Sequence, residues 1–266
     1  MTAPRTAIIA GQGALAPLLA ARLDNPVIAA LEGFAPDLPH QPFRLERLVP
    51  FFDWLAEQGV ERVAFAGAVR RPRLDPEAFD ARTASLVPRI LGAMQSGDDA
   101  ALRVVIALFE EAGFTVAGTA AIAADLVPGP GILTGTPSEA DARDADRAAA
   151  IVAAMGPLDI GQGVVVAQGL CLAVETLPGT EAMLDFAARH RDLCPDAGGA
   201  RGVLFKAPKP GQDLRIDLPA IGPDTVTQVV RAGLGGIAFQ AGGVILLDRE
   251  DMLERARAGG VFIWAR

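Results

Sequence analysis

The stretch Thr6-Ala-Ile-Ile-Ala-Gly-Gln-Gly-Ala-Leu15 decides the fold of the N-terminal half of the chain. Its apolar run, residues 6–10, predicts a buried strand, and residues 14–23 have the spacing of a helix. A second apolar run, residues 27–31, follows this helix. A strand, a helix and another strand in this order are typical of a parallel α/β sheet covered by helices.

The alternation continues up to about residue 130. We expect helices at 51–58 and from the N-cap candidates Ser96 and Asp98 to Glu111, and strands at 62–66 and 115–117. Two Pro/Gly clusters then follow, Pro128-Gly-Pro-Gly131 and Gly135-Thr-Pro-Ser138. Such clusters favour a linker. The sequence therefore predicts an N-terminal Rossmann-like domain over residues 1–134.

Residues 135–266 have a different pattern, which predicts a C-terminal α/β domain with a mixed sheet. Two strands, 163–167 and 170–175, are close enough to form a hairpin around Gln168-Gly169. The other expected strands are 202–206, 236–240, 244–247 and 261–265, and the expected helices are 141–155, 181–190, 224–231 and one ending at Arg257.

Composition excludes several classes of protein. The chain has 266 residues, 51% of them hydrophobic and 21% charged, which predicts packed domains and no disorder. The net charge of -8 argues against nucleic-acid binding. Two cysteines, Cys171 and Cys194, predict reduced thiols, and His40 and His190 are too isolated to suggest a zinc site or a Ser-His-Asp triad. No apolar run reaches the roughly 20 residues of a spanning helix, and we expect no signal peptide.

Arginines surround the prolines near residue 72. These are Arg70, Arg71, Arg73, Arg82 and Arg89. A basic patch of this kind could meet a lipid surface, but a solvated loop is the favoured interpretation.

A glycine-rich turn follows the first predicted strand. Gly11, Gly13 and Ala16 fit the pattern G-x-G-x-x-A, and Glu32 lies about 20 residues further on, as in dinucleotide-binding domains. The backbone NH groups of such a turn can bind phosphate. The same turn also occurs where a strand and a helix simply pack closely. Phosphate contact, NAD binding and plain packing all remain open from the sequence.

Two adjacent acids, Asp98 and Asp99, lie at the predicted start of a helix, with Arg103 one turn later. They suit an N-cap and a first-turn acid, or contact with a ribose hydroxyl or Mg²⁺.

The only two lysines, Lys206 and Lys209, open a polar segment, whereas 22 arginines carry the other cationic side chains. Where arginine is preferred so strongly, a retained lysine suggests that a compact ammonium is needed, as in phosphate binding. Further along, Asp213, Arg215 and Asp217 alternate, so in an extended conformation they would face one side. This pattern suits a bound diphosphate with a metal. The alternative is an exposed, self-neutralising edge strand.

The ordered motifs of the chain resemble the LpxI-type UDP-2,3-diacylglucosamine diphosphatases of lipid A biosynthesis. The matching pieces are Ala10-Gly-Gln-Gly-Ala-Leu15, Phe65-Ala-Gly-Ala-Val-Arg-Arg-Pro72, Gly97-Asp-Asp-Ala-Ala-Leu-Arg103, Glu110-Glu-Ala-Gly-Phe114, Leu158-Asp-Ile-Gly-Gln-Gly163, Val174-Glu175, Gly179-Thr-Glu-Ala-Met-Leu184, Lys206-Ala-Pro-Lys-Pro210, Ile216-Asp-Leu-Pro219 and Ile221-Gly222. The chain departs from the family at Pro178 and Glu181, where the family usually has Glu and Asp, and near Asp185, where an arginine is expected.

The resemblance implies a cytoplasmic hydrolase with two domains and a substrate cleft between them. The implied reaction is Mg²⁺-dependent cleavage of UDP-2,3-diacylglucosamine into 2,3-diacylglucosamine 1-phosphate (lipid X) and UMP. It also leaves open oligomerisation and a transient contact with the inner-membrane surface. Nucleic acid is not an expected partner.

Together, the residues and the resemblance predict a site. Asp217, Lys206, Lys209 and Glu175 are the candidate catalytic residues, and Asp217 and Asp213 the candidate metal ligands. The candidate substrate-binding residues are Gly11, Gly13, Asp98, Asp99, Gln162, Gly179, Thr180, Asp213 and Arg215. The alternatives are an NAD-dependent oxidoreductase that uses Gly11, Gly13 and Glu32, and a non-catalytic nucleotide-lipid binding protein.

Overall fold

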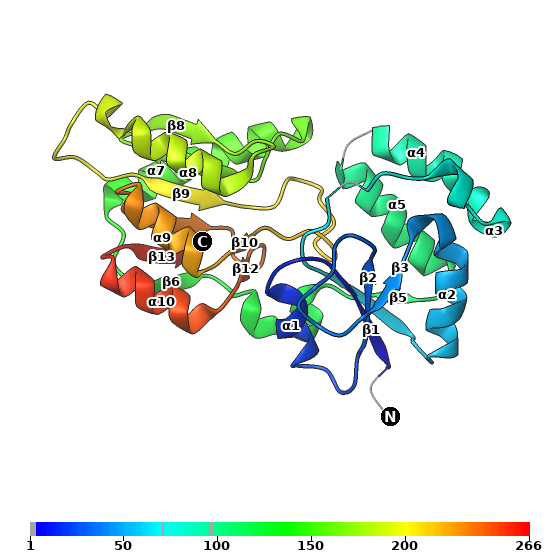
Figure 1. Cartoon of the computed structure of the whole chain (residues 1–266). Coiled ribbons are helices and arrows are strands. Elements are labelled where there is room, and N and C mark those ends of the chain that lie inside the picture. Colours follow the sequence, from blue (N-terminus) through cyan, green and yellow to red (C-terminus); the bar gives the residue numbers. More distant parts are fainter. Residues whose placement is uncertain (1–3, 71, 96–97) are drawn as a thin grey trace. The chain divides into compact units, whose positions relative to one another are not determined.

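The computed structural model describes residues 4–70, 72–95 and 98–266, and of Asp98 and Asp99 it describes only the backbone. The chain forms two compact units (Figure 1). Unit 1 comprises the residues up to Ala124 together with Asp213–Asp217, and unit 2 comprises Asp125–Gln212 and Leu218–Arg266. A short segment from the C-terminal half of the sequence therefore belongs to the N-terminal unit.

Unit 1 is a parallel five-stranded sheet with the order β3-β2-β1-β4-β5. The strands are β1 (Thr6–Ala10), β2 (Val27–Leu31), β3 (Gln41–Phe43), β4 (Arg62–Ala66) and β5 (Thr115–Val116). The helices are α1 (Leu15–Ala20), α2 (Leu48–Glu57), α3 (Ala81–Ala84), α4 (Val87–Gln95), α5 (Asp98–Glu111) and α6 (Thr119–Ile122). The strand order reverses between β1 and β4, as in Rossmann-type sheets.

Aromatic side chains join the sheet of unit 1 to helices α2 and α5. The rings of Phe43 and Phe51 stack with their centroids 4.0 Å apart. Phe109 of α5 makes edge contacts with Phe52 of α2 and Phe65 of β4, at 4.8 and 5.2 Å. Because aromatic pairs contribute beyond the area they bury, these few rings hold α2 and α5 against the sheet.

Unit 2 contains a mixed six-stranded sheet with the order β6-β13-β11-β9-β7-β8, and β10 and β12 pair separately. The strands are β6 (Gly131–Thr134), β7 (Gly163–Ala167), β8 (Leu170–Val174), β9 (Val203–Lys206), β10 (Ala220–Ile221), β11 (Gly236–Phe239), β12 (Ile245–Leu246) and β13 (Phe262–Ala265). The helices are α7 (Glu139–Met155), α8 (Gly179–Arg189), α9 (Pro223–Arg231) and α10 (Arg249–Ala258).

The central strands of the six-stranded sheet are buried on both faces. Leu204 of β9 lies in a cluster with residues of α8, α9 and α10, whereas its neighbours Val203 and Phe205 lie in a cluster with residues of α7. Successive side chains of a strand point to opposite faces, so each central strand contributes to both clusters. Burial on both faces explains the continuous apolar runs of these strands.

The predicted fold class, a parallel N-terminal sheet and a mixed C-terminal α/β part, is confirmed. The short strands β3, β6 and β10 were not expected from the sequence. Residues 131–134, which we placed at the end of the N-terminal domain, form β6 and pair with β13 in unit 2. Short edge strands of this kind have too little apolar pattern to be recognised and depend on their partner strand.

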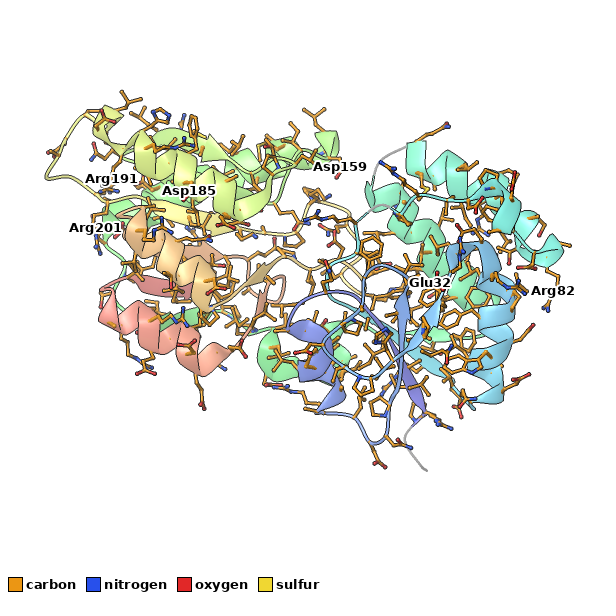
Figure 2. All side chains as sticks on the ribbon, in the orientation of Figure 1. Glu32, Arg82, Asp159, Asp185, Arg191 and Arg201 are labelled. Carbon is orange, nitrogen blue, oxygen red and sulfur yellow. The ribbon has the colours of Figure 1, made fainter. Side chains whose placement is uncertain are left out.

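The loop expected around the arginines is wrong for residues 81–84 and 87–95, which are helical. The Asp80 side chain caps α3 by accepting from the backbone of Arg82 and Thr83. Arg82 (labelled in Figure 2) forms an ion pair with Asp53, and Arg89 forms one with Glu111. Arg82 and Arg89 therefore join elements of unit 1 to one another. Arg71 lies outside the described residues.

Candidate functional site

The predicted polar residues of unit 2 gather at one edge of its six-stranded sheet. Strands β9, β11 and β13 are parallel and end at this edge, where antiparallel β7 begins and β8 ends. Open α/β sheets bind ligands outside the carboxyl ends of their strands. The topology thus brings together three segments that are distant in sequence: 159–163, 175–180 and 206–212.

Lys206 is the last residue of β9, and only 6% of it is exposed. Its Nζ donates to the Thr180 hydroxyl at 2.8 Å and to the Ala220 carbonyl at 3.4 Å, and lies 3.6 Å from Glu175 Oε1. The Thr180 hydroxyl in turn donates to Glu175 Oε1. The structure therefore joins three of the predicted residues in one buried group, the Glu175–Thr180–Lys206 cluster.

Two glycines make room for the Glu175 carboxylate. A Cβ on Gly163 would lie 2.8 Å from Glu175 Oε2, and one on Gly161 would lie 2.1 Å from the Glu175 carbonyl oxygen. Within the described part of the chain, the buried Oε2 atom has no hydrogen-bond partner. Buried carboxylate atoms are normally satisfied, and a buried ion pair is seldom more stable than apolar packing. The cluster is therefore better explained by function than by stability.

A second polar group lies beside the first. Lys209 Nζ donates to the Asp159 side chain. Asp159 (labelled in Figure 2) has a left-handed backbone conformation and follows α7 and a short 3₁₀ turn. The Lys209 backbone N donates to Gln212 Oε1 at 2.8 Å, and Gln162 donates to the same oxygen at 3.0 Å. The Lys209 side chain is 12% exposed. Neither lysine therefore points into bulk solvent.

Gln212, Asp159 and Glu110 are polar partners that our sequence analysis did not select as site residues. Gln212 is 8% exposed, although it lies in a turn rich in Pro and Gly, where exposure is the usual expectation. Asp159 belongs to a motif used for the resemblance, and that motif was its only signal.

Gly179 begins α8 and lines an apolar pocket of about 480 Å³ next to Thr180. The pocket is lined by Cys171, Leu172, Ala173, Val174, Thr176, Pro178, Gly179, Ala182, Met183 and Phe186. A further pocket of about 530 Å³, lined by Arg201 and Arg257 among others, includes residues that precede β9, β11 and β13, and so lies at the opposite edge of the sheet.

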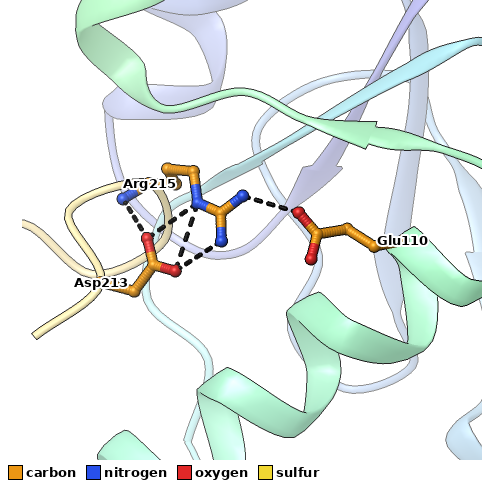
Figure 3. A network of polar contacts seen from close by, with 3 residues as sticks. All are labelled: Glu110, Asp213 and Arg215. Atoms are coloured by element: carbon orange, nitrogen blue, oxygen red, sulfur yellow. Dashed lines mark hydrogen bonds and ion pairs between the residues drawn. The ribbon is translucent and has the colours of Figure 1, made fainter.

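Asp213 and Arg215 lie in the segment that belongs to unit 1, and they bind each other (Figure 3). The Arg215 side chain donates to both oxygens of Asp213, at 2.7 to 3.2 Å, and to Glu110 of α5 at 2.7 Å. The hydrogen bonds from Arg215 lower the pKa of Asp213, and those to Asp213 and Glu110 raise the pKa of Arg215.

The extended conformation expected for 213–217 is wrong. The segment forms a turn at residues 214–216, in which the Asp213 side chain accepts from the Arg215 backbone N at 3.0 Å. Aspartate favours such turns because its side chain bonds to the backbone two residues later. Asp217, two residues after Arg215, is partly buried.

The glycine-rich turn of unit 1 uses its backbone for internal contacts. Gly11 N donates to the Ala66 carbonyl at 2.8 Å, and Gln12 and Ala68 exchange two backbone hydrogen bonds of 3.0 and 2.8 Å. A Cβ on Gly11 would lie 2.5 Å from the Ala68 carbonyl oxygen. Two of the NH groups that could bind phosphate are therefore occupied. This favours packing over dinucleotide binding.

The other residues of the dinucleotide pattern give it little support. Gly13 has φ of +100°, with open space where a side chain would be, so glycine is required there by the backbone. The Glu32 carboxylate lies 3.8 Å from the guanidinium of Arg44, which directly follows β3, so it already has a charged partner. Asp98 and Asp99 begin α5, but their side chains lie outside the described structure.

The donors for a metal are few. Among the side chains that the structure describes, which do not include those of Asp98 and Asp99, no three His, Cys, Asp or Glu residues converge to hold an ion. Both oxygens of Asp213 are already neutralised by Arg215, so Asp213 fits the role of a Mg²⁺ ligand poorly. Asp217 is the other predicted metal ligand, and it is partly buried. One carboxylate can suffice when the substrate phosphates supply further oxygens.

Within the described residues, no helix combines the length and the apolar character needed to cross a bilayer.

Fold and site together define a class of protein. It has a Rossmann-like parallel unit and a mixed α/β unit, with two largely buried ammonium groups at the carboxyl edge of the mixed sheet. Ammonium groups held with a hydroxyl and amides are suited to binding a small, phosphate-bearing ligand.

Comparison with known proteins identifies the family. Residues 5–126 match the LpxI N-terminal domain and residues 129–264 the LpxI C-terminal domain. The chain is 38% identical over 270 residues to the UDP-2,3-diacylglucosamine pyrophosphatase LpxI of Caulobacter vibrioides. The alignment covers 96% of this chain and 95% of that protein. The chain belongs to the LpxI family, which confirms the resemblance seen in its motifs.

Proposed function

We propose that this protein hydrolyses the pyrophosphate bond of UDP-2,3-diacylglucosamine, giving 2,3-diacylglucosamine 1-phosphate and UMP, a step of lipid A biosynthesis. The observation that carries the proposal, besides family membership, is the buried Glu175–Thr180–Lys206 cluster at the carboxyl edge of the sheet. A cation held inside the protein interacts with a diphosphate far more strongly than one in water.

Each residue of the cluster has a distinct task in this proposal. The Lys206 ammonium neutralises charge that develops on the pyrophosphate, and Thr180 and Glu175 hold it in place. Lys209, held by Asp159, supplies a second positive charge three residues away in sequence. Gln162 and Gln212 orient the turn that carries Lys209.

Asp217 is the acidic residue we assign to the reaction, and Mg²⁺ is the proposed cofactor. When bound, Mg²⁺ would neutralise phosphate oxygens and favour an ionised water. Asp217 would hold it together with the substrate's own oxygens, since one carboxylate can suffice when phosphate oxygens complete the coordination.

The apolar pocket beside Gly179 supports a lipid substrate. It adjoins the cluster through Gly179 and Thr176, and its lining from β8 and α8 is mostly aliphatic or aromatic. An acyl chain placed there would leave water without exposing the charged cluster.

The direct test is to incubate the purified protein with UDP-2,3-diacylglucosamine and Mg²⁺ and to measure UMP. We expect turnover that EDTA abolishes and that Asp217→Asn reduces at least a hundredfold, the scale of losing a main electrostatic group. Full turnover by Asp217→Asn would remove this residue from the mechanism. Tight binding of the substrate without UMP release, under any divalent metal, would instead indicate a nucleotide-lipid binding protein.

We also propose a cytoplasmic location with transient contact with the inner-membrane surface, where a diacylated substrate resides. The free thiols of Cys171 and Cys194 and the strongly exposed Leu158, Leu177 and Leu193 support this proposal. Co-sedimentation with anionic vesicles, compared for the wild type and Leu177→Ser, would test the membrane contact.

A further inference from the structure

One segment of the C-terminal half of the chain is fixed within unit 1 by charge. The Arg215 guanidinium lies between Asp213 and Glu110, and each of its three nitrogens donates to a carboxylate (Figure 3). Glu110 and Arg215 are 105 residues apart in sequence. This contact therefore holds the turn against a distant helix.

Helix α5 is complementary in charge to this turn. Arg103 and Glu110 are seven residues apart, two helical turns, and so lie on the same side of α5. Arg103 lowers the pKa of Asp213 through its charge, and Glu110 binds Arg215. A positive and a negative residue of α5 thus face an acid and a base of the turn.

Apolar and steric contacts fix the turn on the same unit. Ile216 packs against the hydrophobic cluster of unit 1. A Cβ on Gly118, the N-cap residue of α6, would lie 3.0 Å from Arg215 Cα and 3.3 Å from the Leu214 carbonyl oxygen. Glycine at 118 thus lets the turn approach α6 closely.

We propose that Glu110, Arg215 and Asp213 are positioning residues that hold the turn before Asp217, and thereby place the Asp217 carboxylate for hydrolysis. This inference rests on the proposed function. The sequence suggested that Asp213 and Arg215 touch the substrate. In the arrangement seen here, two carboxylates, those of Asp213 and Glu110, already neutralise the Arg215 guanidinium, which weakens its attraction for a phosphate.

The test compares Glu110→Gln with Glu111→Gln, its neighbour on α5, which pairs with the exposed Arg89 instead. We expect Glu110→Gln to lower kcat by roughly tenfold to a hundredfold with KM unchanged, the loss that a displacement of up to about 1 Å produces. Glu111→Gln should keep both constants. Arg215→Lys should retain more activity than Arg215→Ala, because it keeps the charge but not the paired geometry.

Hydrogen exchange of the peptide covering residues 213–217 gives a readout without turnover. Exchange should be faster in Glu110→Gln than in the wild type and unchanged in Glu111→Gln. A raised KM with unchanged kcat in Glu110→Gln would overturn positioning in favour of substrate binding. So would unchanged exchange together with wild-type activity. If the wild-type protein shows no turnover, the proposed function itself fails. If the wild type is active and only the results for Glu110→Gln differ from expectation, the positioning role alone fails.

Discussion

The carboxyl edges of the two sheets differ in how they use their polar groups. In unit 1, Gly11 and Gln12 give their backbone NH groups to the β4 connection. In unit 2, Lys206 and Glu175 place charged side chains in a largely buried group, in which Glu175 Oε2 has no hydrogen-bond partner among the described residues. The first edge matches a known motif and is explained by packing. The second matches no short motif and is difficult to explain without a ligand.

The comparison shows what a motif can and cannot tell. A glycine is required wherever backbones approach closely, whether or not a phosphate binds. A buried ammonium costs free energy, so its presence needs a reason beyond folding. Three of the four experiments that follow could break or sharpen this contrast between the two edges, and the fourth tests the ion pair of Asp213 with Arg215.

The largest effect is expected from Lys206→Met. It leaves Glu175 buried without its cation, so we expect loss of at least a hundredfold in kcat/KM and destabilisation of about 3–5 kcal/mol. Lys206→Met combined with Glu175→Gln should recover most of the stability but not the activity. Urea unfolding and UMP release measure the two separately. Recovery of activity in the double variant would contradict a role for the charges in the reaction.

The next effect concerns the hydroxyl between the two charges. Thr180→Val removes both of its hydrogen bonds, so we expect stability to fall by about 1–3 kcal/mol and kcat to fall by roughly tenfold. Thr180→Ser keeps the hydroxyl and serves as the matched control. Equal activity of the Val and Ser variants in the UMP assay would mean that the hydroxyl is dispensable.

At the edge of unit 1 we expect the opposite outcome. Gly11→Ala forces its methyl group against the Ala68 carbonyl oxygen, so stability should fall by about 1–3 kcal/mol. Turnover per folded molecule should change less than twofold, because the turn serves packing. Thermal unfolding and active-site-normalised kinetics provide the measurements. A large rise in KM at unchanged stability would restore phosphate binding to this turn.

The smallest effect concerns acid stability. Hydrogen bonds from Arg215 depress the pKa of Asp213 in the folded state. The pair therefore stabilises the fold fully above the pKa of an unfolded aspartate, about 3.9. This contribution is lost as the pH falls through the lower pKa of the folded state. Arg215 is partly exposed, so we expect about 1 kcal/mol or less. Unfolding free energies of the wild type and Asp213→Asn from pH 5 to pH 2.5 should converge at low pH. Parallel curves would argue against the pair.

The regular elements with strong apolar patterns were predictable from the sequence. Strands β1, β2 and β4, the β7–β8 hairpin and helix α7 all lie where periodicity and caps placed them. The helix pair α3 and α4 was missed because prolines and arginines hide a weak apolar pattern. Strands β3 and β10 were missed because two or three residues carry no period at all.

The candidate site was predictable as a set of residues but not as an arrangement. The two lysines and Glu175 could be selected from their residue types and from the family motifs. Thr180 was selected as well, but not as the partner of Lys206 and Glu175. Asp159 and Gln212 were not selected, because they reach Lys209 through turns. The alternation of Asp213, Arg215 and Asp217 misled us, since local hydrogen bonds to Asp213 favour a turn there.

Amino-acid order alone was enough to establish the α/β class, the family and the residue types available for chemistry, because these depend on local periodicity and on short ordered motifs. Only the folded chain revealed which charges are buried, which glycines make room for them, and that residues 213–217 belong to unit 1. Those properties arise from contacts between distant segments, such as that of Glu110 with Arg215, 105 residues apart, and no local pattern encodes such contacts.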